Sequence, residues 1–275
     1  MKDFRRYSGQ RFRYDINLVV KILDILQNYS KEDIKVKDLA YILKIGVPKV
    51  QAFKNYCEIC DLIKDKKLTN FGRYILRFKD NLDIYLPLLF YKLCRGWDNG
   101  GHFYYSRIVN NILYDKYYSG DNTIENSEIK EKLMDFKFEY DKIDVKLVTL
   151  VTTGISSDDG FGHLGMLTRE EKSKFIINYY KPKPLIAAYI IYDSWPNNVT
   201  SISFEKIIND EYSLGRIFLL TEDDIIPILS KLHQDNYIKI EDKAGLKQIV
   251  KNSNISADMI LEEIYNVYFS NTFTD

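Results

Sequence analysis

Residues 47–60, VPKVQAFKNYCEIC, mix apolar side chains with amides and lysines at helical spacing. Val50, Phe53 and Cys57 recur at intervals of three and four, which predicts a helix with one buried stripe. Four polar side chains are then expected on the outer surface of this helix, namely Lys49, Gln51, Lys54 and Asn55. Glutamine and asparagine can pair with adenine in the major groove and lysine can neutralise phosphates, so this surface could read duplex DNA.

A short lysine-rich segment follows this helix. Residues 63–68, IKDKKL, predict a two-stranded hairpin whose turn is Asp65-Lys66-Lys67. Lys64, Lys66 and Lys67 would then meet the DNA backbone beside the groove. Outward glutamines and lysines are also ordinary solvated residues, and winged helices often contact proteins. The sequence therefore leaves a DNA surface and a protein surface both open.

Catalytic chemistry has weaker support in the sequence. Four residues are candidates by type alone, as a general base or as metal ligands: Asp98, His102, Asp121 and Glu128. A lone histidine beside aromatic residues, such as His102, is more often structural, and Glu128 lies in a predicted helix rather than on a nuclease strand. The glycine-rich segment 154–167 lacks the Gly-Lys-Ser/Thr of a phosphate-binding loop. Cys57-x-x-Cys60 lies on an apolar helix stripe, which favours core packing over a redox or zinc site.

The helix and the hairpin belong to a longer predicted order of elements. Three helices precede the hairpin, at 14–27, 37–43 and 47–60, and a further helix begins after Asn70. This is the order of a winged helix. The last third repeats the order, with a hairpin in NYIKIEDKAGLKQIVK after three helices at 185–192, 203–208 and 222–233. Helices are also expected between these parts, at 81–95, 128–136 and 144–153.

We therefore predict a mainly α protein with small β-hairpins. Two winged-helix-like modules, at 1–79 and 181–275, would be joined by a helical connecting region at 80–180. A length of 275 residues is enough for separate cores of this kind. The sequence has neither an apolar run of about 18 residues nor the apolar N-terminal segment of a secretory signal, so we expect a cytoplasmic protein.

The net charge of zero conceals a strong asymmetry along the chain. Residues 1–79 hold 18 Lys and Arg against 9 Asp and Glu, whereas residues 80–275 hold 21 against 30. A basic module joined to an acidic body suits a polyanion on one side and a different partner on the other. The charge thus favours nucleic acid as a partner of the N-terminal module, although a biased surface charge can also serve only to solvate the protein.

Five blocks of the sequence together resemble a known bacterial family. They are YSGQRFR, LKIGVPKVQAFKNYCEICDLI with LTNFGRYIL, DNLDIYLPLLFYKL, EYSLGRIFLLTEDDIIPIL and DKAGLKQIV. In this order and spacing they resemble the family known as domain of unknown function 4007. The resemblance covers nearly the whole chain, and it implies a place in DNA phosphorothioation and phage-defence systems.

The resemblance further implies the nicking component of the Ssp type. Such a protein would cut one DNA strand so that sulfur, supplied by a cysteine desulfurase and an ATP-dependent partner, can enter the backbone. A divalent metal, magnesium or manganese, would be the expected cofactor of a nickase. Double-stranded DNA and other subunits of the sulfur-modification machinery are the partners implied, and a homodimer is a further option.

The first block departs from the family pattern, which reads Phe-Ser-Gly-His-Glu. Here the block is Tyr7-Ser8-Gly9-Gln10-Arg11, and neither Gln10 nor Arg11 can replace a general base or a carboxylate ligand. Arg11 and Arg13 could still hold phosphate, together with Arg5, Arg6 and Gln10. Three functions therefore remain open: a nickase, a non-enzymatic DNA-binding adaptor, and a winged-helix transcriptional regulator.

Overall fold

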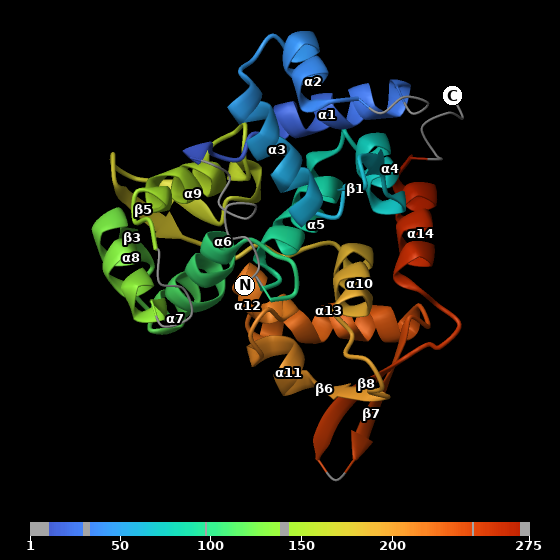
Figure 1. Ribbon diagram of the computed structural model, residues 1–275. Helices are drawn as coiled ribbons and strands as arrows, with labels where there is room; N and C mark the ends of the chain where they lie inside the picture. The colour runs from blue at the N-terminus through green and yellow to red at the C-terminus, as the bar shows by residue number, and fades with distance from the viewer. Residues whose placement is uncertain (1–10, 30–33, 97, 138–142, 244, 270–275) are drawn as a thin grey trace. The chain divides into compact units, whose positions relative to one another are not determined.

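The computed structural model describes residues 11–29, 34–96, 98–137, 143–243 and 245–269 (Figure 1). The chain divides into two compact units, Met1–Asn178 and Tyr179–Asp275. The predicted segments 1–79 and 80–180 fall almost entirely in the first unit, and the predicted last segment begins two residues after the second unit does.

The first unit opens with three helices and a hairpin, in the predicted order. These elements are α1 (Ile16–Asn28), α2 (Val36–Leu43), α3 (Val47–Ile59), β1 (Ile63–Lys64), β2 (Lys67–Leu68) and α4 (Asn70–Arg77). The Asp15 carboxylate accepts a hydrogen bond from Leu18 N at the start of α1, and Thr69 Oγ1 accepts one from Gly72 N at the start of α4. Such caps satisfy backbone donors that a helix leaves unpaired at its N-terminus.

The hairpin turn is shorter than the sequence predicted. Asp65 and Lys66 have φ angles of 49° and 64°, so both lie in the left-handed region, and Lys67 already belongs to β2. Two left-handed residues make the tight turn that matches the twist of a hairpin. The predicted three-residue turn is therefore wrong by one residue.

The remainder of the first unit contains a sheet that the sequence did not predict. Its helices are α5 (Leu82–Cys94), α6 (Phe103–Arg107), the π-helical η3 (Ile108–Leu113), α7 (Tyr114–Tyr118), α8 (Asn126–Leu133), η4 (Met134–Phe136), α9 (Leu147–Ser156) and η5 (Gly162–Leu164). Its strands are β3 (Thr123–Glu125), β4 (Leu167–Arg169) and β5 (Lys174–Ile177). They form an antiparallel sheet in the order β3-β5-β4, so the connecting region is not wholly helical.

The second unit has the predicted three helices and hairpin together with further elements. Its elements are α10 (Pro184–Asp193), β6 (Ser201–Ser203), α11 (Phe204–Asn209), α12 (Leu214–Phe218), α13 (Glu222–Gln234), β7 (Ile238–Lys243), β8 (Leu246–Lys251) and α14 (Ala257–Phe269). The strands form an antiparallel sheet in the order β6-β8-β7. Strand β6 and helices α12 and α14 are short or terminal elements that the sequence analysis missed.

Aromatic rings fill the core of the first unit. The Tyr14 ring stacks on Phe161 at 4.8 Å between centroids and meets Tyr56 edge-on at 5.1 Å. Cys57 and Cys60 are fully buried, which agrees with core packing, and burial raises the pKa of the Cys60 thiol to about 12. Helix α5 is buried along its whole length from Ile84 to Cys94. No helix within the described ranges has the length and apolar character needed to span a membrane.

Candidate nucleic-acid interface

The structure changes which residues of α3 face outward. Asn55 was predicted on the outer surface, but its side chain is buried and only 4% exposed. Helix α3 packs against both α1 and α2, and Tyr56 stacks on His102 at 5.6 Å, so more of its circumference is enclosed than one apolar stripe predicts. The prediction of an outward Asn55 is therefore wrong.

A narrower stripe of α3 remains open to solvent. Val47, Gln51, Lys54 and Glu58 follow one another at intervals of three and four residues, which places them on one side of the helix. Gln51 Nε2 donates a hydrogen bond to Asn55 Oδ1 at 2.9 Å. Lys54 Nζ lies 3.8 Å from Glu58 Oε1, so the C-terminal end of the stripe carries a paired charge.

The end of α2 and the start of α3 expose apolar side chains. Tyr41 is 86% exposed, Ile42 41% and Val47 42%. An open depression beside them is lined by residues 40–42 and 44–46, including Lys44. Lys49 lies over the Phe53 ring at 5.9 Å, which leaves its charged end near the start of α3. The N-terminal end of α3 is therefore both apolar and basic at its surface.

The hairpin lysines lie in solvent, and α4 extends the basic surface. Lys64, Lys66 and Lys67 are all exposed. Arg73 and Arg77 are also exposed and stand one turn apart on α4, and Arg73 Nη1 donates to Leu68 O at 3.1 Å. These two arginines were not among the predicted site residues, although their spacing of four residues within a predicted helix is visible in the sequence.

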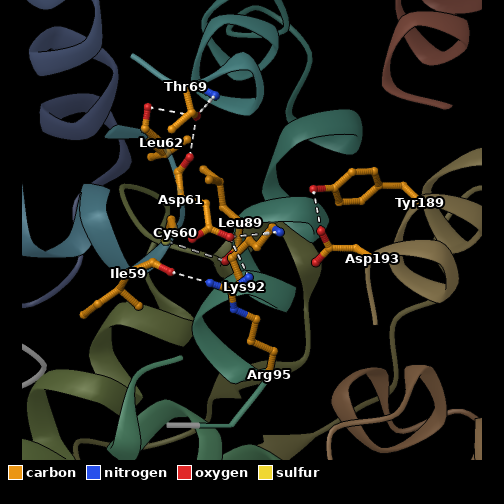
Figure 2. A network of polar contacts seen from close by, with 11 residues as sticks. Ile59, Cys60, Asp61, Leu62, Thr69, Leu89, Lys92, Arg95, Tyr189 and Asp193 are labelled. Atoms are coloured by element: carbon orange, nitrogen blue, oxygen red, sulfur yellow. Dashed lines mark hydrogen bonds and ion pairs between the residues drawn. The ribbon is translucent and has the colours of Figure 1, made fainter. Parts of the chain in front are cut away.

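Asp61 ties the start of the hairpin to α5 through a network of ion pairs (Figure 2). Its Oδ2 lies 2.6 Å from Arg95 Nη1 and 3.1 Å from the buried Lys92 Nζ. Partial burial works against ionisation of Asp61, but the hydrogen bond and charge of Arg95, with those of Lys92, lower its pKa on balance. Arg95 Nη2 also donates to Ile59 O at 3.3 Å. The network holds the end of α3 and the base of the hairpin in a fixed geometry.

The two N-terminal arginines that were predicted to hold phosphate face carboxylates instead. Arg11 Nε lies 3.9 Å from Asp144 Oδ2, and Arg13 forms an ion pair with Asp159. A phosphate would have to compete with these partners. The rest of the first block, with Gln10, and the residues before it lie outside the described part of the chain.

His102 is enclosed by aromatic rings. It is 1% exposed, with the Tyr56 ring stacked on it at 5.6 Å and the Tyr105 ring perpendicular to it at 5.2 Å. Burial lowers the pKa of the His102 imidazole to about 3, and neither ring nitrogen has a hydrogen-bond partner among the described residues. A ring in this position is neutral near pH 7 and is shielded from any substrate in solution.

The structure brings together two of the acidic candidates, but through a lysine. Lys116 Nζ lies 2.6 Å from Asp121 Oδ2 and 3.0 Å from Glu128 Oε1. The hydrogen bond from Lys116 is the main cause that lowers the pKa of Asp121. A protonated amine thus already bridges the two carboxylates, while Asp98 lies exposed in the turn before α6. Asp98 and His102 are not part of this cluster.

The fit of these residues to a divalent metal is poor. Two carboxylates bridged by an ammonium group supply too few free oxygen ligands for magnesium or manganese. Among the residues that the structure describes, no three or more His, Cys, Asp and Glu side chains gather in a way that could hold a metal ion. The described donors therefore do not support the divalent metal that a nickase would be expected to use.

Comparisons with known proteins bear on the family and the fold. No curated protein matches the sequence significantly. Residues 154–265 match the family model "Protein of unknown function (DUF4007)". The resemblance to the DUF4007 family is thus confirmed. The two distal blocks of the five lie within the residues that match the DUF4007 model.

Two solved structures share the fold of the whole chain. An SspB crystal structure has a TM-score of 0.74 at 14% sequence identity, and a magnesium ion-bound SspB crystal structure has 0.71 at 13%. Each match covers 100% of the present chain and 90% of the SspB chain. The chain therefore has an SspB-like fold, and identities this low carry the fold alone.

Proposed function

We propose that this protein is a DNA-binding component of a bacterial DNA phosphorothioation and phage-defence system. The observation that carries the DNA part is the exposure of Lys64, Lys66 and Lys67 on the hairpin and of Arg73 and Arg77 on α4, where Arg73 donates to Leu68 O of the hairpin. The sulfur-modification part is supported by the DUF4007 match and by the SspB-like fold.

Both units are proposed to be winged-helix modules. In the first unit the short hairpin β1–β2 follows three helices. In the second unit the hairpin β7–β8 follows helices α10, α11, α12 and α13, and β6 completes the sheet beside β8. A helix with a hairpin beside it is an arrangement that can place a helix end in the major groove and the hairpin against the backbone.

The two units are proposed to have different partners. Residues 179–275 contain nine Lys and Arg against fourteen Asp and Glu, and α13 begins with Glu222 and Asp223, both exposed. Carboxylates at that position would repel DNA, whereas Lys49 lies at the corresponding end of α3. We infer that the first unit binds DNA and that the second contacts another subunit of the machinery.

The arrangement of the acidic candidates favours an adaptor over a nickase. His102 is buried, Lys116 bridges Asp121 and Glu128, and Asp98 stands elsewhere. Nicking by this chain alone would require groups that the described residues do not assemble. The partner that cuts the strand would then be a different subunit, which this protein would hold on DNA.

Salt dependence tests the DNA part directly. If roughly six phosphates are neutralised, the log-log slope of affinity against salt should be about −5. Replacing Lys64, Lys66 and Lys67 by glutamine should reduce the magnitude of the slope by about 2.7, because each phosphate contact contributes about 0.9.

A matched variant controls for the loss of three charges. Lys206, Lys231 and Lys247 are exposed lysines of the second unit, and their replacement by glutamine should leave the slope nearly unchanged. Fluorescence anisotropy on one duplex from about 50 to 200 mM salt measures all three proteins. Equal slopes in the two triple variants would contradict the assignment of the hairpin to DNA.

A plasmid assay decides between the adaptor and the nickase. Supercoiled plasmid is incubated with the protein and magnesium or manganese, with an EDTA control, and binding is measured on the same DNA. The adaptor predicts binding without open circles. Metal-dependent open circles that disappear in Asp121→Asn would instead establish a nickase that assembles its site around the Asp121 cluster.

A further inference from the structure

Helix α3 holds one amide side chain in a fixed position at the protein surface. Gln51 is half-buried on the solvent stripe, and its Nε2 donates to Asn55 Oδ1 at 2.9 Å. Asn55 is only 4% exposed, so packing fixes the acceptor on which the Gln51 amide rests. The orientation of the Gln51 amide is therefore set before any partner arrives.

The hydrogen bond to Asn55 leaves part of the Gln51 amide available. A glutamine side chain has two N–H donors and one carbonyl oxygen, and the bond to Asn55 uses one N–H. One N–H and Oε1 remain for a partner. Adenine offers the complementary pair in the major groove, because N7 accepts and the N6 amino group donates.

An apolar contact stands one helical turn before this amide. Val47 lies four residues before Gln51, hence on the same side of α3, and its side chain is 42% exposed. The thymine of an A·T pair carries a methyl group at the major-groove edge. Along this stripe of α3, the first carboxylate is Glu58, which is paired with Lys54, so the N-terminal half of the stripe has no charge that would repel DNA.

We propose that Gln51 reads the adenine of an A·T base pair, that Val47 contacts the thymine methyl group, and that Asn55 is a positioning residue for Gln51. This inference rests on the proposed DNA-binding function and adds its base preference. It replaces the prediction that Gln51 and Asn55 both touch bases. The competing interpretation is that the Gln51–Asn55 hydrogen bond only stabilises α3.

Selection from a pool of random duplexes tests the proposal. Wild-type protein should enrich an A·T pair at a fixed position, with discrimination of about 5- to 150-fold against G·C for a two-bond contact. Gln51→Ala and Asn55→Ala should lose this preference while keeping the salt slope of the wild type. Gln27→Ala, which removes an exposed glutamine from α1, should behave as the wild type does.

Modified bases test the same contacts without changing the protein. The contacts can therefore still be tested if Asn55→Ala folds poorly. In the selected duplex, 7-deazaadenine removes the N7 acceptor and should weaken binding by the wild type but not by Gln51→Ala. Uracil in place of thymine removes one methyl group and should weaken wild-type binding about fourfold, and it should leave Val47→Ala unaffected.

The outcomes separate this inference from the proposed function. Wild-type binding without an A·T preference, or an unchanged preference in Gln51→Ala, would overturn the base-reading role and leave DNA binding standing. A preference lost in Gln51→Ala but kept in a folded Asn55→Ala would overturn only the positioning role. No binding of the pool by the wild type would overturn both.

Discussion

His102 and Asn55 are both buried polar side chains, 1% and 4% exposed, but they differ in the hydrogen bonds of their polar atoms. Asn55 accepts a hydrogen bond from Gln51, whereas both ring nitrogens of His102 lack a hydrogen-bond partner in the described part of the chain. A buried imidazole without partners is stable only in its neutral form, because its charged form loses hydration and gains nothing in return. His102 therefore makes the fold sensitive to acid.

The pH dependence of stability should reveal this. The pKa of His102 is about 3 in the folded state, below the value of 6.5 expected when unfolded. Its contribution is thus complete above pH 6.5 and is lost as the pH falls toward 3, by about 1.4 kcal/mol per pH unit.

His102→Phe removes the titrating group. When the pH falls from 7.5 to 5, the free energy of unfolding of the wild type should therefore decrease by about 2 kcal/mol more than that of the variant. Urea unfolding at both pH values measures the change. Each protein serves as its own reference, since only the difference between the two pH values is compared. Parallel pH profiles would show that His102 can be protonated in the folded protein.

Among the elements, the hairpin of the second unit is bonded at both ends to one hydroxyl group. Tyr192 of α10 donates its hydroxyl hydrogen to Tyr237 O, and its oxygen accepts from Asn252 N at 3.0 Å. Tyr237 and Asn252 flank β7 and β8, so one side chain ties both ends of the hairpin to the same helix. Partial burial also raises the pKa of Tyr192.

Tyr192→Phe should lower the free energy of unfolding by about 0.5–1.5 kcal/mol, because the hydrogen bonds of the hydroxyl group are lost while Asn252 N keeps its bond to Tyr237 O at 3.2 Å. Tyr179→Phe is the matched control, since Tyr179 is 48% exposed, and its effect should stay within about 0.5 kcal/mol. Urea titrations at pH 7.5 provide the comparison. Similar midpoints and slopes for the two variants would mean that water replaces the Tyr192 hydroxyl without cost.

Elements with strong periodicity could be predicted from the sequence, and short ones could not. The three helices predicted before each hairpin have apolar residues at helical intervals, so their positions were found within a few residues. Strands β3 and β4 have only three residues each, too few to show an alternating pattern. The exposed hairpin lysines followed from their charge, but the burial of Asn55 depends on how many neighbours surround α3, which a helical wheel does not contain.

The whole molecule combines two units of opposite charge. Residues 1–178 contain thirty Lys and Arg against twenty-five Asp and Glu, and residues 179–275 contain nine against fourteen. Each unit has its own helices, and the described residues form two sheets in the first unit and one in the second. The division suits a protein that joins DNA to a second partner, and the charges predict which unit does which.

Separating the units at Asn178 should separate these activities. A fragment of residues 179–275 should unfold cooperatively on heating, because Ile186, Leu229 and Ile249 are fully buried within that unit. It should not shift a duplex at low salt, whereas residues 1–178 should. Circular dichroism and gel shifts measure the two properties. DNA binding by a folded 179–275 fragment would contradict the proposal that the basic surface of the first unit is the DNA-binding surface.

The start of α1 depends on residues far along the chain. Ile16 N donates to Asp159 O at 2.8 Å, and Arg13 pairs with the Asp159 carboxylate across a sequence separation of 146 residues. During synthesis at about 5–20 residues per second, these contacts must wait about 7 to 30 s after Arg13 is made. Over that interval the nascent chain exposes a lysine- and arginine-rich segment, because Asp159, which binds its residues Arg13 and Ile16, has not been translated. On a ribosome surrounded by RNA, this delay gives chaperones or nucleic acid the first opportunity to bind it.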